Sequence, residues 1–169
     1  MAVLLDFHYS DTWADPAHQT PPAAWQNLSF EDMKDSVYQY TRDVLEAFDN
    51  AQVAPDYIQI GNEINGGFLW DAGRVGDSFD ANWPQCAALL KEGLRAVSET
   101  LPETQTMIHF AGYEYASWFY QNLQTHNVEY DIIALSYYHW WHGTDLDELE
   151  QNLQQLITDF DKPVFITET

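Results

Sequence analysis

Five short apolar segments alternate with helical patterns along this chain of 169 residues. Each segment is rich in Val, Ile, Leu, Phe or Tyr and almost continuously apolar, as parallel strands are when both faces of their sheet are covered. A strand followed by a helix, repeated in one order, is the βαβ pattern and predicts a parallel sheet. The expected strands are Ala2–His8, Asp56–Gly61, Gln105–Phe110, Asp131–Tyr138 and Pro163–Glu168.

Apolar residues at helical spacing fill the intervals between these strands. The first helix is expected to start after Ser29, which is placed with Asp32 like a capping box. The second is expected to begin at Pro84 and to stop before Pro102. A shorter helix is expected near Ser117, and the last helix carries an apolar stripe of Leu146, Leu149, Leu153, Leu156, Ile157 and Phe160.

The segments that follow the first two strands, residues 9–27 and 62–83, are long and rich in polar and aromatic side chains. The segments that lead back into the strands are short. This asymmetry is typical of a (β/α)₈ TIM barrel, an α/β fold whose active site lies at the C-terminal ends of the strands. A complete barrel takes about 250 residues. We therefore expect one domain, residues 1–169, that forms a partial barrel of five βα units; an open five-stranded sheet is the alternative.

The charge balance narrows the possible partners. The chain has 6 Lys and Arg against 27 Asp and Glu, a net charge of −21. Nucleic acid and membrane partners are not expected, because no basic stripe is present to bind phosphates and no apolar run approaches the roughly 20 residues that span a bilayer. The first six residues lack the basic segment of a signal peptide.

The cysteine and histidine residues give no sign of a metal centre. A single cysteine, Cys86, excludes an internal disulfide and a cysteine-based zinc site, and its apolar neighbours indicate a buried thiol. The six histidines form neither a His-x-His nor a His-Glu-x-x-His pattern. No metal and no cofactor is therefore expected.

Two glutamates stand at the ends of predicted strands. Glu63 follows Asn62 after the second strand, and Glu168 ends the last one. Glycoside hydrolysis needs two carboxyl groups, one to protonate the leaving oxygen and one to act at the anomeric carbon. If the barrel brings these strand ends together, the two residues form a catalytic pair. Taken alone, each is equally compatible with a solvated or salt-bridged glutamate.

Aromatic residues are abundant, with 7 Trp, 10 Tyr and 9 Phe. Their flat apolar faces suit stacking on sugar rings, although core packing is the alternative for each Trp. Side chains alternate along a strand, so the aromatic run after the fourth strand is expected to place some rings on a surface. His8 and His142 are interpreted as hydrogen-bond partners of the substrate or of Glu63. The candidate substrate-binding residues are His8, Asp11, Trp13, Asn62, Trp70, Tyr137, Tyr138, Trp140, Trp141 and His142.

Four motifs resemble one known family. The run from Leu4 to Pro16, LLDFHYSDTWADP, resembles the third-strand motif of the arabinogalactan endo-β-1,4-galactanases, glycoside hydrolase family 53. Residues 60–70 resemble the fourth-strand segment of that family, residues 136–144 its sixth-strand signature, and residues 162–169 its seventh. The likeness runs essentially from end to end of the chain.

The resemblance implies part of a (β/α)₈ barrel, strands three to seven, that cleaves internal β-1,4-galactosidic bonds of (arabino)galactan with retention. It implies that Glu63 is the acid/base, that Glu168 is the nucleophile, and that the protein acts in an extracellular or periplasmic location. Asn62 would hold the sugar 2-hydroxyl, and Tyr137 or Tyr138 would hydrogen-bond Glu168.

The family pattern also includes strands one, two and eight, with a second-strand Arg and a region that binds calcium in some bacterial relatives, and these have no counterpart here. Two alternatives stay open. One is a retaining β-mannanase or β-glucanase on the same barrel, and the other is an inactive, truncated glycan-binding fragment.

Overall fold

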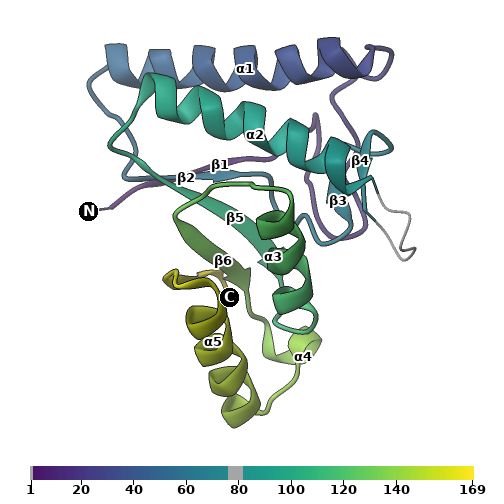
Figure 1. Ribbon diagram of the computed structural model, residues 1–169. Coiled ribbons are helices and arrows are strands. Elements are labelled where there is room, and N and C mark those ends of the chain that lie inside the picture. Colours follow the sequence, from purple (N-terminus) through teal and green to yellow (C-terminus); the bar gives the residue numbers. More distant parts are fainter. Residues whose placement is uncertain (1, 76–81) are drawn as a thin grey trace.

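A computed structural model describes residues 2–75 and 82–169 (Figure 1). Its centre is a parallel sheet in which every pair of neighbouring strands runs in the same direction. The five predicted strands are confirmed, with small differences at their ends. Their order in the sheet is β1 (Leu4–Phe7), β2 (Tyr57–Ile60), β5 (Gln105–Ala111), β6 (Ile132–Ser136) and β7 (Val164–Glu168).

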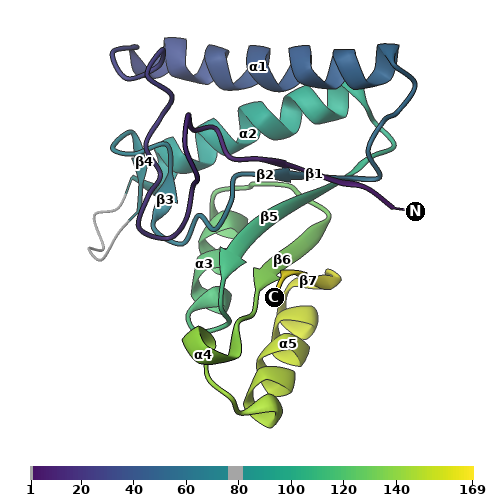
Figure 2. The ribbon, with the colours of Figure 1, turned by 180° about the vertical axis from the view of Figure 1, so that it is seen from behind.

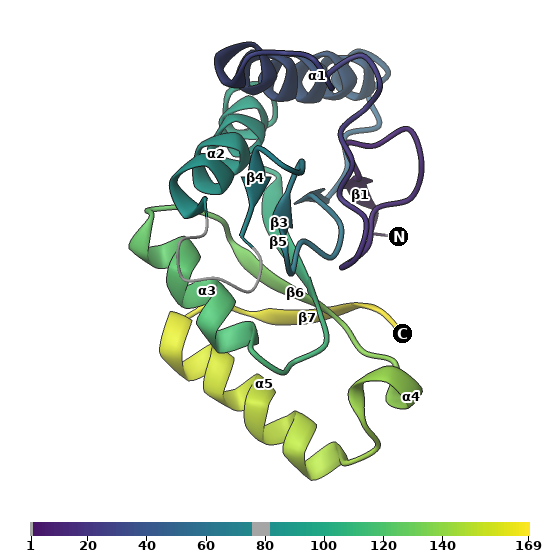
Figure 3. The ribbon, with the colours of Figure 1, turned by 90° about the vertical axis from the view of Figure 1, so that its right-hand side faces the viewer.

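The long helices all lie on the outer side of this sheet, and the two ends of the chain lie on the other side (Figure 3). The predicted cap of the first helix is confirmed, because the Ser29 hydroxyl oxygen accepts the Asp32 N–H at 3.2 Å. Pro84 lies in the first turn of the second helix, where its missing N–H costs nothing. The helices are α1 (Phe30–Asn50), α2 (Trp83–Thr100), α3 (Ala116–Thr125) and α5 (Leu146–Phe160).

The main apolar core fills the space between the sheet and these helices. Outward-facing strand residues such as Ile58 and Ile108 are fully buried there, and each contributes roughly 1.5–3 kcal/mol by leaving water. Cys86 belongs to the same cluster, as expected, and burial raises the pKa of its thiol to about 12. This core holds the strands in place from outside, so polar residues that project from the strands can serve the inner side.

The sheet curls around that inner side. Tyr57 of β2 and Phe165 of β7 have ring centroids 5.4 Å apart, although β5 and β6 lie between their strands in the sheet. A second, smaller apolar cluster packs against Tyr57 and consists of Met107, Ile132 and Ala134. In a flat open sheet, β2 and β7 would lie three strand spacings apart, about 14 Å. In the view from behind, β1 and β7 form the two edges of the curled sheet (Figure 2).

Two short elements were not predicted. A hairpin of β3 (Gly67–Phe68) and β4 (Gly73–Arg74) follows β2, and residues 76–81 of that long segment lie outside the described residues. The expected strand Asp131–Tyr138 was too long: β6 ends at Ser136, and α4 (His139–His142) follows. The aromatic run therefore does not alternate as a strand would. Its local bonds explain the turn, since the N–H groups of Trp141 and His142 both donate to Tyr138 O.

Within the described ranges, no helix is long and apolar enough to cross a membrane.

Candidate active site

A tight turn after β2 positions Glu63. Gly61 has a φ of +83°, and a Cβ at this position would lie 2.8 Å from Ile64 Cγ2, so only glycine fits. Glu63 itself has a left-handed φ of +47°, a conformation that is uncommon for a residue with a side chain. The turn is pinned to β5, because Ile64 N donates to His109 O at 3.0 Å. Glu63 is thereby held at the C-terminal end of the sheet.

Buried polar residues from the next two strands hold the Glu63 side chain. The Ser136 hydroxyl lies 2.5 Å from Glu63 Oε1 and 2.9 Å from Nε2 of His109. The backbone N–H of Glu63 lies 3.3 Å from Nδ1 of the same imidazole ring. Both His109 and Ser136 are completely buried. The carboxyl group is therefore oriented by β5 and β6 as well as by its own turn.

Asn62 supports the same cluster. Its amide nitrogen donates to Ala14 O at 2.8 Å, and its amide oxygen lies 2.8 Å from His109 Nδ1. The Gln19 side chain donates to Asn62 O at 2.8 Å and so ties the β1–α1 loop to the turn after β2. Asn62 is 5% exposed, and both atoms of its amide already have protein partners.

Glu168 reaches the cluster from the end of β7. Its Oε1 lies 4.0 Å from His109 Nδ1, and its Oε2 accepts a hydrogen bond of 3.2 Å from the Tyr138 hydroxyl. The Tyr137 hydroxyl points elsewhere and donates to Gly143 O at 2.8 Å. Of the two tyrosines, Tyr138 is thus the one beside Glu168. The structure brings Glu63 and Glu168 together around the ring of His109.

The surroundings favour a protonated Glu63. Burial raises its pKa, and repulsion from Glu168, Asp15 and Asp6 raises it further, whereas a hydrogen bond from Ser136 acts in the opposite direction. Burial also lowers the pKa of His109 to about 4, so this ring is neutral at neutral pH. A carboxyl group that keeps its proton above the ordinary range can serve as a general acid.

His8 and Asp11 make their hydrogen bonds within β1 and the loop that follows it. His8 Nε2 lies 2.9 Å from Asp6 Oδ2, and its Nδ1 accepts the Ala14 N–H at 3.2 Å. The hydrogen bond with Asp6 is the largest cause of the raised pKa of His8. Asp11 accepts the Ala23 N–H at 2.7 Å and so shapes the β1–α1 loop. The histidine that orients Glu63 is therefore His109.

The predicted tryptophans divide into two groups. Trp13, Trp140 and Trp141 are 69%, 66% and 77% exposed, so their rings are open to a ligand. Trp70 is half-buried: its indole N–H donates to Gly66 O at 2.9 Å, and the Arg74 guanidinium lies 4.4 Å from its ring centroid. One face of Trp70 is thus already covered by the protein.

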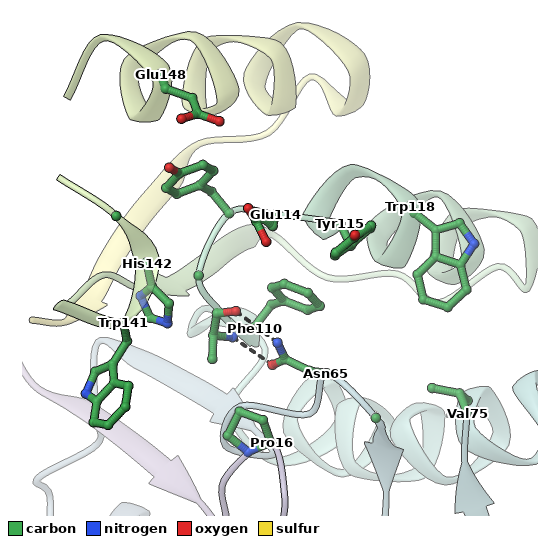
Figure 4. Close-up of a pocket in the computed structure, with 15 residues that line it drawn as sticks. Pro16, Asn65, Val75, Phe110, Glu114, Tyr115, Trp118, Trp141, His142 and Glu148 are labelled. Carbon is green, nitrogen blue, oxygen red and sulfur yellow. Dashed lines mark hydrogen bonds between the residues drawn. The ribbon is translucent and has the colours of Figure 1, made fainter. Parts of the chain in front are cut away.

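An open pocket of about 1010 Å³ lies beyond Glu63, next to β5 (Figure 4). Trp141 and His142 line it on one side, and Tyr115 and Trp118 line it on the other. Among the described residues, its lining contains neither Glu63 nor Glu168. The pocket therefore extends the site without forming its centre.

Two connections join the pocket to the cluster around Glu63. Asn65 follows Glu63 by two residues, donates to Ala111 O at 2.9 Å and accepts the Ala111 N–H at 2.8 Å. Gly112 N donates to Ser136 O at 2.9 Å. Gly112 has a φ of +78°, and a Cβ there would lie 3.0 Å from the His142 ring. The side of the pocket next to β5 is therefore held in place by the same strand ends that hold Glu63.

Three members of the site, His109, Ser136 and Gln59, were not predicted from the sequence. The Gln59 amide nitrogen lies 3.1 Å from His109 Nδ1, and the Gln59 side chain is buried. All three are polar residues inside otherwise apolar strands, which is the signal that could have identified them. In the described part of the chain, no group of three or more His, Cys, Asp or Glu residues could hold a metal ion.

Comparison with known proteins identifies the family. The model of the family described as "Glycosyl hydrolase family 53" matches residues 1–169. The chain belongs to this family. It is 41% identical to the endo-beta-1,4-galactanase of Bacillus subtilis, over 100% of this chain and 38% of that protein. It is 37% identical to the arabinogalactan endo-beta-1,4-galactanase of Cellvibrio japonicus, over 100% of this chain and 46% of that protein.

The solved structures of family 53 support the same assignment. The GH53 catalytic domain of Ignisphaera aggregans is 41% identical and superposes with a TM-score of 0.90, over 96% of this chain and 44% of that one. The chain thus spans less than half the length of these three relatives. Its five parallel strands are part of a (β/α)₈ barrel, as the sequence predicted.

Proposed function

We propose that the barrel to which this chain belongs is an endo-acting hydrolase that cleaves internal β-1,4-galactosidic bonds of galactan or arabinogalactan with retention. One observation carries the proposal: Glu63 and Glu168, from different strand ends, meet around the ring of His109. The substrate is inferred from the family relatives, which are an endo-beta-1,4-galactanase and an arabinogalactan endo-beta-1,4-galactanase. Because a polysaccharide does not cross a membrane, the proposed place of action is extracellular or periplasmic.

The reaction proceeds in two displacements. In the first, a Glu168 oxygen bonds to the anomeric carbon, the glycosidic bond breaks, and the Glu63 proton moves to the departing oxygen. In the second, the Glu63 carboxylate takes a proton from water, the water oxygen bonds to the same carbon, and Glu168 is released. Tyr138 donates to Glu168 and keeps it oriented. The raised pKa of Glu63 favours the protonated form that the first step needs.

The pocket beside Glu63 is the proposed binding region for the leaving part of the substrate, because Glu63 protonates that side of the bond. The exposed rings of Trp141 on one side of the pocket and Tyr115 on the other are available there for stacking on a sugar face. Trp13 and Trp140 are further candidate platforms. Asn62 is proposed to hold the 2-hydroxyl of the reacting sugar, and the remaining proposed sugar contacts are His8, Asp11, Trp70, Tyr137, Tyr138 and His142.

The proposal is tested with Glu63→Ala and Glu168→Ala in the full-length protein that contains these residues. Release of reducing sugar from β-1,4-galactan is expected to fall roughly 10²–10⁴-fold for Glu63→Ala, and at least as far for Glu168→Ala. Glu103→Ala, at the opposite end of the sheet, is the matched control and is expected to keep full activity. Retained cleavage by Glu168→Ala would remove the nucleophile assignment.

Added azide distinguishes the two roles. It can replace the missing nucleophile in Glu168→Ala and yield a glycosyl azide of inverted configuration. In Glu63→Ala it can attack the glycosyl–enzyme and yield the retained configuration. The same azide product from both variants would contradict the assignment. Assays on β-mannan and carboxymethylcellulose test the other substrates, and higher rates on either would replace galactan in the proposal.

A further inference from the structure

The hydroxyl of Ser136 lies between two groups that can accept its proton. One is Glu63 Oε1 at 2.5 Å, and the other is His109 Nε2 at 2.9 Å. A hydroxyl has a single proton to donate, together with lone pairs that can accept. Ser136 can therefore donate to only one of these neighbours at a time, and the proton positions on His109 and Glu63 decide which.

The shortest contact of the His109 ring indicates its tautomer. The Asn62 amide nitrogen donates to Ala14 O, so the amide oxygen is turned towards His109 Nδ1, 2.8 Å away. Two acceptors at this separation would repel each other, whereas a proton on Nδ1 makes a good hydrogen bond. The Glu63 N–H and the Gln59 amide nitrogen also face Nδ1, but at the longer distances of 3.3 Å and 3.1 Å. Gln59 also donates to the Asn62 oxygen, at 3.3 Å. With the proton on Nδ1, Nε2 faces Ser136 as an acceptor.

We propose that Ser136 is a positioning residue whose hydroxyl turns between His109 and Glu63 as Glu63 alternates between carboxylic acid and carboxylate. This inference rests on the proposed acid/base role of Glu63. When Glu63 is protonated, it donates to Ser136, and Ser136 donates to His109 Nε2. After Glu63 has given its proton to the leaving oxygen, the hydroxyl turns and donates to the carboxylate. Ser136 and His109 keep their own protons throughout.

A partner of this kind suits a residue that must act first as an acid and then as a base. A lysine or a backbone N–H in the place of Ser136 could only donate, and would therefore stabilise the carboxylate alone. A hydroxyl backed by a fixed acceptor makes a hydrogen bond with either form. His109 can supply that acceptor because burial lowers the pKa of the ring to about 4, so the ring is neutral at any higher pH.

The other charged groups around the cluster also affect the protonation of Glu63 and His109. Glu168 on β7, Asp6 on β1 and Asp15 in the β1–α1 loop all disfavour a charged Glu63. For His109, the charge of Asp6 favours the protonated ring and that of His8 disfavours it. These groups favour the acid form of Glu63, so the donated bond from Ser136 is what stabilises the base form in the second step.

Two substitutions should move the pH profile in opposite directions. Ser136→Ala removes the donor to the carboxylate, so the basic limb of kcat/KM is expected to move to higher pH and kcat to fall about tenfold. His109→Leu removes the competing acceptor, so Ser136 donates to Glu63 without opposition and the basic limb is expected to move to lower pH. Shifts in the same direction, or no shift in either variant, would overturn the proposal.

A control separates this effect from general loss of a buried hydroxyl. Thr41→Val removes a buried hydroxyl that lies 2.7 Å from the Tyr9 hydroxyl, away from Glu63, and is expected to leave the limb in place. Glu63→Gln in the same assay tests the proposed function itself. If Glu63→Gln is inactive while the opposite shifts are absent, only the inference about Ser136 fails.

Nitrogen-15 NMR of histidine in the 169-residue chain tests the tautomer without any activity. His109 is expected to show a protonated Nδ1 and an accepting Nε2 at neutral pH, with its signal assigned by His109→Gln. His126 serves as the reference, because its Nδ1 lies 2.9 Å from Asn122 O and can only donate to that carbonyl. A proton on His109 Nε2 would overturn the proposal, even if the substitutions reduced activity.

Discussion

Tyr57 and Phe165 meet edge to face across the inner side of the sheet, with ring centroids 5.4 Å apart and an angle of 66° between the rings. Their strands, β2 and β7, are not neighbours. The contact joins the N-terminal ends of the two strands on the inner side of the sheet. The carboxyl pair lies at the C-terminal ends of the same two strands. Curvature at the level of these rings therefore helps to bring Glu63 towards Glu168.

Phe165→Ala is expected to lower the free energy of unfolding by about 1–2 kcal/mol, less than for a fully buried phenylalanine, because the side chain is 36% exposed. Urea denaturation of the chain, followed by circular dichroism, measures the change. Ile157→Ala is the control, since Ile157 lies on the outer helix α5 and is 41% exposed. An equal loss in both variants would show that the contact across the sheet contributes nothing specific.

A second prediction concerns the wall of the pocket. Asn65→Ala removes both hydrogen bonds to the backbone of Ala111 and leaves a donor and an acceptor without their partner. We expect a loss of about 2 kcal/mol in the free energy of unfolding. Asn122→Ala removes one exposed hydrogen bond, to Trp118 O, and is expected to change stability by less than about 0.5 kcal/mol. Thermal denaturation of the three proteins compares them directly.

Sequence patterns were sufficient for the strands and long helices because burial on both faces leaves a continuous apolar signal. They also placed Glu63 and Glu168 at strand ends, where parallel strands must bring them to the same edge. The short helix α4 was missed because a four-residue helix rests on local bonds to Tyr138 O, which leave no periodic pattern. His109 was missed for another reason: its role depends on contacts with Asn62 and Ser136, which are distant in sequence.

The two adjacent tryptophans of α4 provide a matched pair for substrate binding. Trp141 lines the pocket, whereas Trp140 packs edge to face on His139 with centroids 4.2 Å apart. Trp141→Ala is expected to raise KM for long galacto-oligosaccharides about tenfold, from the loss of one stacking contact. Trp140→Ala should change it less. Kinetics with oligosaccharides of increasing length measure the effect, and a larger rise for Trp140→Ala would place the substrate on the other side of α4.

The last prediction is a pH dependence of stability. The pKa of His109 is lowered from 6.5 to about 4, so between these values the unfolded chain binds a proton that the folded chain does not. The free energy of unfolding should therefore rise with pH across this window, by about 3 kcal/mol from this residue. His109→Gln should flatten that part of the curve when urea denaturation is repeated from pH 4 to 7.

His8 contributes with the opposite sign. Its pKa is raised, chiefly by the hydrogen bond with Asp6, so its contribution is complete below pH 6.5 and is lost as the pH rises through the folded-state pKa. Asp6→Asn should remove this loss on the alkaline side and leave the slope below pH 6.5 that belongs to His109. If Asp6→Asn instead removed the slope between pH 4 and 6.5, the buried ring of His109 would not be the group that titrates there.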